Sequence, residues 1–95
     1  MIIGTLEIHL RLEGCYSLKD KRRILRSAID RSRRDFRVSI SEVADHDLWN
    51  VATVGVACVG NDAGVIESIL TKVVDLFDTN PEVKVEAANR EIEGR

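Results

Sequence analysis

The chain has 95 residues, 44% of them hydrophobic and 32% charged, with a formal net charge of −2. This length suits one domain over residues 1–95. No apolar stretch approaches the ~20 residues that span a bilayer. The first ten residues have neither a basic leader nor a small-residue cleavage site, so we expect no secretory signal, no membrane partner and a cytoplasmic protein. Two cysteines, Cys15 and Cys58, are too few for a disulfide framework or a zinc quartet.

Residues 2–12 alternate between two faces, which predicts a half-buried β-strand. One face carries Gly4 and five aliphatic side chains, Ile2, Leu6, Ile8, Leu10 and Leu12. The other face carries Ile3, Thr5, Glu7, His9 and Arg11. A turn over residues 13–16 then leads to Ser17, a typical helix N-cap, with Asp20 at the capping-box position.

The stretch Ser17–Arg37 predicts an amphipathic helix that carries most of the positive charge. Between Lys19 and Arg37, nine Lys or Arg stand against three Asp, a local charge of +6, so the other residues together carry −8. At ~100° per residue, the predicted core face contains Leu18, Leu25, Ala28, Ile29, Ser32 and Phe36. Seven basic residues share one flank of the same wheel: Lys19, Arg22, Arg23, Arg26, Arg33, Arg34 and Arg37.

This basic flank is our candidate nucleic-acid-binding site. Lys and Arg neutralise phosphates and release counterions, which gives affinity without reading the bases. The alternative interpretation is a solvated helix face whose charges form local pairs such as Asp30 with Arg34. The one-sided clustering favours a polyanionic partner.

Three strands and a second helix are predicted in the rest of the chain. The first strand covers Val38–Ala44, with Val38, Ile40 and Ala44 inward, and the next covers residues 51–60, with small or apolar residues on both faces. Asn61 and Asp62 cap a helix that ends at Asn80-Pro81. Its apolar stripe contains Val65, Ile66, Ile69, Leu70, Val73, Leu76 and Phe77. A last strand over residues 83–88 is expected to fray into the charged tail.

The element order β-α-β-β-α-β predicts an α+β, ferredoxin-like domain. Right-handed crossovers then give an antiparallel sheet ordered 4-1-3-2, with two helices on one face. This topology places the turn before the basic helix, the loop over residues 45–50 and the turn over residues 78–81 at one end of the sheet. The start of the basic helix should therefore lie near this loop.

Two stretches, SLKDKRR at residues 17–23 and EVADHDLWN at residues 42–50, resemble the YlxP-like family of small bacterial proteins, a domain of unknown function. The resemblance covers essentially the whole chain and implies a ferredoxin-like fold. Members are often encoded near translation and ribosome-maturation genes, which implies an RNA-related role by association only. It implies no catalytic residues, and His46 departs from the polar residue that is common at its position.

The loop over residues 45–50 is a second candidate, a partner site formed by Asp45, His46, Asp47 and Trp49. Carboxylate and imidazole ligands would suit Mg, Mn or Zn. In an extended chain, however, the two Asp point one way and His46 the other, so we predict no metal. The alternative is that the acids face Lys19, Lys21 or Arg23. Trp49 either packs against the hairpin end or, if exposed, stacks on a base or a partner.

We therefore expect a non-enzymatic binding protein without catalytic residues or cofactors, associated with RNA or the ribosome through the basic flank. The open sheet face offers no aromatic side chains on its central strands, so recognition should involve the RNA backbone or shape. One alternative is a homodimeric interaction or regulatory module that buries Ile3, Val51, Ala57 and Val59 of that face. Another is a metal-dependent phosphodiesterase, which rests on fold analogy. Glu7 and His9 could form an acid/base pair, but a polar sheet surface explains them equally well.

Overall fold

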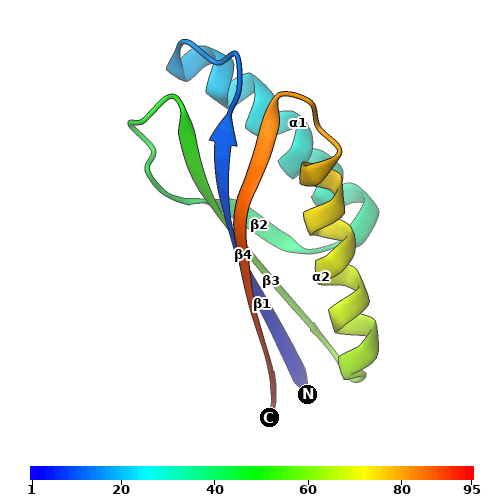
Figure 1. Ribbon diagram of the computed structural model, residues 1–95. Coiled ribbons are helices and arrows are strands. Elements are labelled where there is room, and N and C mark those ends of the chain that lie inside the picture. The colour runs from blue at the N-terminus through cyan, green and yellow to red at the C-terminus, as the bar shows by residue number, and fades with distance from the viewer.

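The computed structural model describes residues 1–95 as one four-stranded antiparallel sheet with two helices on the same face (Figure 1). The strands lie in the order β2-β3-β1-β4, which is the predicted order read from the opposite edge. The predicted ferredoxin-like α+β fold is therefore confirmed. The elements in chain order are β1 (Ile2–Leu12), α1 (Leu18–Phe36), β2 (Ser39–Ala44), β3 (Val51–Gly60), α2 (Ala63–Asp78) and β4 (Val83–Gly94).

Both helices begin at the caps that the sequence predicts. The side chain of Ser17 accepts a hydrogen bond from the backbone N of Asp20 at 3.1 Å, and Asp62 accepts one from Val65 N at 3.1 Å. The carboxylate of Asp20 returns to the backbone N of Tyr16, at 3.4 Å, and not to that of Ser17. Each cap satisfies a backbone donor that has no partner within the helix.

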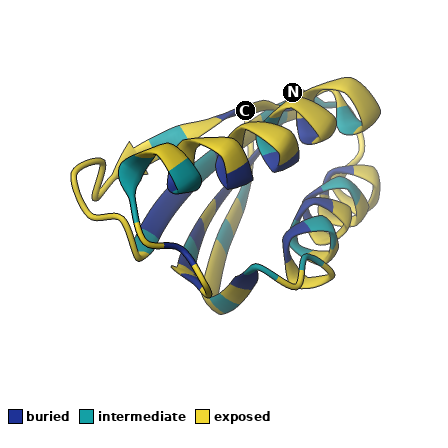
Figure 2. Cartoon of the chain, turned by 90° about the horizontal axis from the view of Figure 1, so that it is seen from above, coloured by how far each residue is buried: buried dark blue, intermediate teal, exposed yellow.

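The core lies between the helices and the sheet. Figure 2 shows the buried residues on the sides of α1 and α2 that face the sheet, and exposed residues on their outer sides. Gly4 of β1 lets α2 approach closely, because a Cβ at this position would lie 2.3 Å from Cγ2 of Ile66. The apolar core contains residues of all four strands and both helices, among them Ile8, Leu25, Ile40, Val54 and Leu70.

Three details of the sequence prediction are wrong. Ala44 is exposed, because a β-bulge between Glu42 and Ala44 changes the direction of the side chains at the end of β2. Val65 lies at the solvent edge of the α2 stripe and is exposed. The last strand does not fray at residue 88, since β4 pairs with β1 as far as Gly94, opposite Ile2. Its charged side chains point to solvent and leave the backbone free to pair.

Neither helix is both long and apolar enough to cross a membrane.

Candidate functional site

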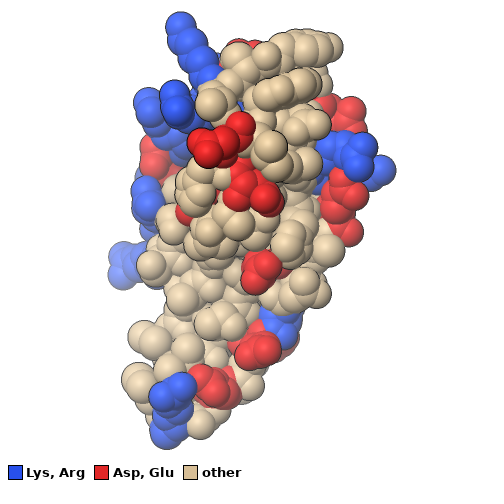
Figure 3. All heavy atoms as spheres, turned by 90° about the vertical axis from the view of Figure 1, so that its left-hand side faces the viewer, with Lys and Arg blue, Asp and Glu red and all other residues tan.

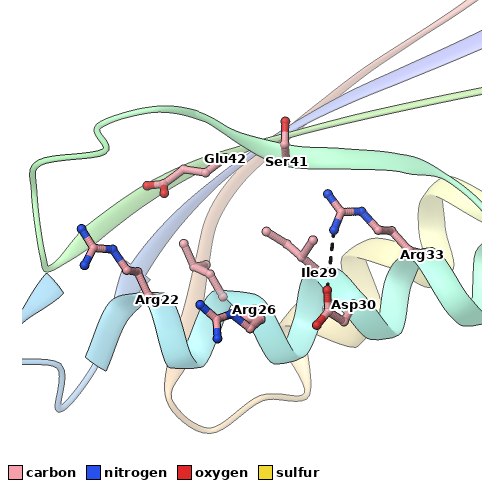
Figure 4. A pocket seen from close by; sticks show the side chains of 8 residues that line it. Arg22, Arg26, Ile29, Asp30, Arg33, Ser41 and Glu42 are labelled. Atoms are coloured by element: carbon pink, nitrogen blue, oxygen red, sulfur yellow. Dashed lines mark ion pairs between the residues drawn. The ribbon is translucent and has the colours of Figure 1, made fainter. Parts of the chain in front are cut away.

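The basic flank borders two hollows along α1. The first lies between α1 and β2, and Figure 4 shows Arg22, Arg26 and Arg33 following one another along the helix, across from Ser41 and Glu42. Its floor is apolar only at Leu25 and Ile29, the two hydrophobic side chains among its eight lining residues. Ligand pockets for small molecules are predominantly apolar. A hollow lined mostly by charged and polar residues, with three Arg side chains along it, suits an anionic partner better.

The second hollow adjoins the first on the outer side of α1. Arg22 and Arg26 border both hollows, and Lys19 and Arg23 line only the second. Arg34 and Arg37, at the end of the helix, line neither. The structure therefore brings together five of the seven predicted basic residues around the two hollows, Lys19, Arg22, Arg23, Arg26 and Arg33.

Within this group, only two of the five cations form an ion pair. Arg23 pairs with Glu82 at 3.0 Å. Arg33 lies 3.6 Å from Asp30 and also donates to the carbonyl of Ile40 at 2.8 Å. The remaining three, Lys19, Arg22 and Arg26, form no ion pair. Their charge is therefore available to an external anion.

Two pairs at the margins of the flank are reflected in pKa shifts. The hydrogen bond from Arg34, assisted by Arg31, lowers the pKa of Asp35. The hydrogen bond to Glu82 raises the pKa of Arg23. These carboxylates thus offset part of the positive charge of α1 at neutral pH, and the unpaired charge is concentrated on the side of Lys19, Arg22 and Arg26.

Lys21 has a different role from its basic neighbours, because its side chain is buried with a relative exposure of 1%. Its Nζ lies 2.7 Å from Oε2 of Glu42, and it donates to the carbonyls of Asp45 at 2.7 Å and Leu48 at 2.5 Å. These three partners match the three N–H donors of an ammonium group. Two spacings in the sequence could have indicated this role. Lys21 lies one helical turn before the core residue Leu25, and Glu42 lies two residues after inward-facing Ile40 in a strand, so both side chains are placed on the core side of their elements.

The loop over residues 45–50 lies against the start of α1, as predicted, but its acids do not pair with that helix. Asp45 has a φ of 63°, and its carboxylate turns back to accept a hydrogen bond from Thr53 of β3 at 2.9 Å. His46 contacts the carbonyl of Glu42 at 3.1 Å. The predicted pairing of Asp45 or Asp47 with the first turns of α1 is therefore wrong, because Glu42 and the loop carbonyls hold Lys21. No three His, Cys, Asp or Glu side chains converge in an arrangement that could hold a metal ion.

Trp49 is exposed, with a relative exposure of 44%, so it is not a buried plug at the end of the hairpin. Its ring lies beside that of Tyr16, with centroids 6.3 Å apart and planes inclined by 32°. The buried thiol of Cys15 donates to the carbonyl of Trp49 at 3.0 Å. Tyr16 is not among the site residues predicted from the sequence, although its position in the turn before the helix cap favours an exposed side chain.

The remaining candidates lie on the open face of the sheet. His9 Nε2 is 3.0 Å from Glu7, and its Nδ1 is 3.5 Å from the hydroxyl of Thr53. These contacts form a polar network on the sheet surface, away from both hollows. Figure 3 shows the side of the molecule that lies on the left in Figure 1, with several Lys and Arg side chains along its left edge, others at its right and bottom, and Asp and Glu side chains across its middle. The Lys and Arg residues without an ion pair are Lys19, Arg22 and Arg26 of α1, Arg37 directly after it, and Lys72 and Lys84.

These features define a ferredoxin-like α+β domain with a partly unpaired cationic flank on its first helix. The chain belongs to the family described as "Protein of unknown function (DUF503)", whose profile matches residues 3–90. It is similar to "Uncharacterized protein YlxP" of Bacillus subtilis (strain 168), with 32% identity over 83 residues that cover 87% of this chain and 90% of the relative. The resemblance to the YlxP-like family is therefore confirmed.

Solved structures of similar shape support the fold. A de novo designed protein with ferredoxin fold, LFR1 1, has a TM-score of 0.62 and 11% identity, covering 100% of this chain and 88% of that one. The de novo designed protein Foldit4 has a TM-score of 0.57 and 12% identity, covering 98% of both chains. At such low identities the likeness concerns the fold alone.

Proposed function

We propose that this protein binds RNA, or the RNA of the ribosome, through the basic flank of α1. The observation that carries this proposal is the group Lys19, Arg22 and Arg26, which lines adjoining hollows and has no carboxylate partner. Arg22 and Arg26 are one helical turn apart, about 6 Å along the axis. Guanidinium groups at this spacing can contact neighbouring phosphates of one backbone.

The distribution of charge supports a local polyanion site. The protein as a whole is acidic, with a net charge of −2, so it does not attract nucleic acid over its whole surface. Elsewhere, all the Arg residues are paired, for example Arg11 with Glu86 and Arg90 with Glu67, and only Lys72 and Lys84 are not. On the basic flank, Lys19, Arg22, Arg26 and Arg37 have no such partner. A phosphate backbone would supply the missing negative charge and release counterions.

We propose a binding role and not a catalytic one. The exposed Glu7–His9 pair lies outside the basic hollows, so a phosphate held there would not meet a general acid or base from that pair.

A charge-matched pair of variants tests the proposal. Arg22→Glu/Arg26→Glu reverses two unpaired charges on the flank, and Lys72→Glu/Lys84→Glu makes the same change in net charge on α2 and β4. Binding of fluorescein-labelled RNA would be measured by anisotropy between about 50 and 200 mM salt. We expect wild type and the Lys72/Lys84 variant to bind alike, and the Arg22/Arg26 variant to bind more weakly. Its plot of log K against log salt should be shallower by about 1.4, because two phosphate contacts on a single strand are lost.

Two results would contradict the proposal in different ways. Equal binding by both variants would show that the basic flank is not the site. No RNA binding by wild type at the lowest salt would show that the protein does not have this function. Arg33 is left unchanged, since its hydrogen bond to Ile40 links α1 to β2 and its loss would also affect the fold.

A homodimer through the open sheet face is a second proposal, favoured by the exposed apolar side chains Val43 and Val59 on that face. Val43 packs over Gly55 of β3, where a Cβ would lie 2.8 Å from Cγ1 of Val43. Light scattering of wild type and Val59→Lys tests it: a dimer that becomes a monomer in the variant supports the proposal, and a wild-type monomer at all concentrations excludes it.

A further inference from the structure

Three exposed apolar side chains, Tyr16, Leu48 and Trp49, form what we call the aromatic tip. Their relative exposures are 80%, 50% and 44%, and the two rings are neighbours at 6.3 Å. The other two aromatic residues of the chain, Phe36 and Phe77, belong to the core or pack against it. Single exposed apolar residues are ordinary, but a cluster of them marks an interaction surface.

The backbone beneath the aromatic tip is held firmly. The carbonyl of Leu48 accepts from Lys21 Nζ at 2.5 Å, that of Trp49 from the Cys15 thiol at 3.0 Å, and that of Asn50 from Leu12 N at 2.9 Å. Three successive carbonyls of the loop thus face inward, and the side chains of Leu48 and Trp49 remain at the surface. A surface that is already ordered loses little conformational entropy when it binds a partner.

The charges around the tip indicate which part of a nucleic acid it suits. Asp47 is exposed in the same loop, so a phosphate at the tip would be repelled. The unpaired cations Lys19, Arg22 and Arg26 begin three residues after Tyr16, on the helix that starts at the tip. A neutral, flat group would therefore fit the apolar tip beside Asp47, and phosphates would fit the unpaired cations along α1.

We infer that the aromatic tip stacks an unpaired RNA base while the flank of α1 holds the adjoining phosphates. This inference rests on the proposed function and specifies its substrate class, which is single-stranded RNA such as a loop, a bulge or an end. Unpaired bases stack on Tyr and Trp side chains, whereas the bases of a duplex are enclosed. A flank that only binds phosphates through its charge would not distinguish single-stranded from duplex RNA.

The fluorescence of Trp49 gives a direct test, because it is the only tryptophan in the chain. The intact protein would be titrated with oligo(U) of about 12 nucleotides, within the range of single-strand site sizes. The comparison ligand is an abasic ribose-phosphate strand of the same length, which keeps the phosphates and lacks the bases. We expect oligo(U) to quench the emission and to bind at least about fivefold more tightly than the abasic strand.

Variants of Tyr16 separate stacking from charge, and its high exposure makes it safe to change. Tyr16→Ala should bind oligo(U) at least about fivefold more weakly, with unchanged affinity for the abasic strand, and Tyr16→Phe should retain the wild-type affinity. If wild type binds both strands equally and Tyr16→Ala has no effect, the tip does not read bases, although the flank still binds RNA. That result would also be obtained if the tip docks a protein. If wild type binds neither strand, the proposed function and this inference both fail.

Discussion

Lys21 of α1 and Glu42 of β2 form an ion pair of 2.7 Å beneath the β2–β3 loop. The same ammonium group holds two carbonyls of that loop, at Asp45 and Leu48. One side chain thus joins the basic helix to β2 and to the loop that carries Trp49. It differs from the other cations of α1 in being part of the core, and its charge is not available to a partner.

Loss of Lys21 should therefore destabilise the fold strongly. In Lys21→Met, Glu42 and two carbonyls lose their partner, and breaking a buried pair from one side costs about 3–5 kcal/mol of unfolding free energy. Urea denaturation followed by circular dichroism measures this loss. Arg31→Ala is the control, because its i,i+4 pair with Asp35 is exposed and worth only about 0.5 kcal/mol. The double variant Lys21→Met/Glu42→Leu should recover part of the lost stability. If Lys21→Met were as stable as the Arg31→Ala control, Lys21 would not hold Glu42 and the loop as described.

Gly4→Ala should destabilise the contact between β1 and α2. Its new Cβ would lie 2.3 Å from Cγ2 of Ile66 and 3.2 Å from Leu70, so the helix must shift. Overpacking of this kind costs about 1–3 kcal/mol, measured by thermal or urea unfolding. Gly94→Ala serves as the control, because its Cβ would lie 3.7 Å from Ile2, an ordinary contact. In an Ile66→Ala background the cost of Gly4→Ala should largely disappear, and an equal cost in both backgrounds would rule out this clash.

Arg37→Gly should stabilise the end of α1. Arg37 has a φ of 53°, in the left-handed region, where a residue with a Cβ is strained by about 1–2 kcal/mol. Glycine relieves the strain and loses part of the gain through its more flexible unfolded chain, so we expect an increase of about 0.5–1 kcal/mol. Arg34→Gly, inside the helix, should instead lower the stability by about 1 kcal/mol. If both variants are destabilised equally, the conformation at Arg37 is not left-handed.

The carboxyl group of Glu86 should titrate below the ordinary Glu pKa of 4.5, because its hydrogen bond and charge interaction with Arg11 lower it. A pKa that is lower in the folded state gives stability that is present above the unfolded-state value and is lost as the pH falls through the folded-state value. The Arg11–Glu86 ion pair, which links β1 to β4, should therefore weaken below about pH 4.5. An NMR titration of Glu86 measures the shift, which Arg11→Gln should largely remove and Arg95→Gln should leave unchanged. An unshifted Glu86 in wild type would show that the pair does not persist in solution.

Local patterns were sufficient to predict the fold and the location of the charged site. Alternation in residues 2–12 and the caps at Ser17 and Asp62 predicted elements that the structure confirms, because these signals depend on neighbours within one element. The element order then left one sheet arrangement consistent with right-handed crossovers. The basic flank of α1 followed in the same way, from the angular spacing of its residues.

The tertiary structure alone decided what each charged residue of that flank does. Lys21 and Arg22 are adjacent in the sequence and carry the same charge, yet Lys21 is buried against Glu42 and Arg22 faces an open hollow. Arg23 meets Glu82, which is 59 residues away. Such partners depend on strand register, on the bulge at the end of β2 and on the path of the loop, and these are set when the elements pack together. For the same reason the contact of Tyr16 with Trp49, from separate turns, could be seen only in the folded chain.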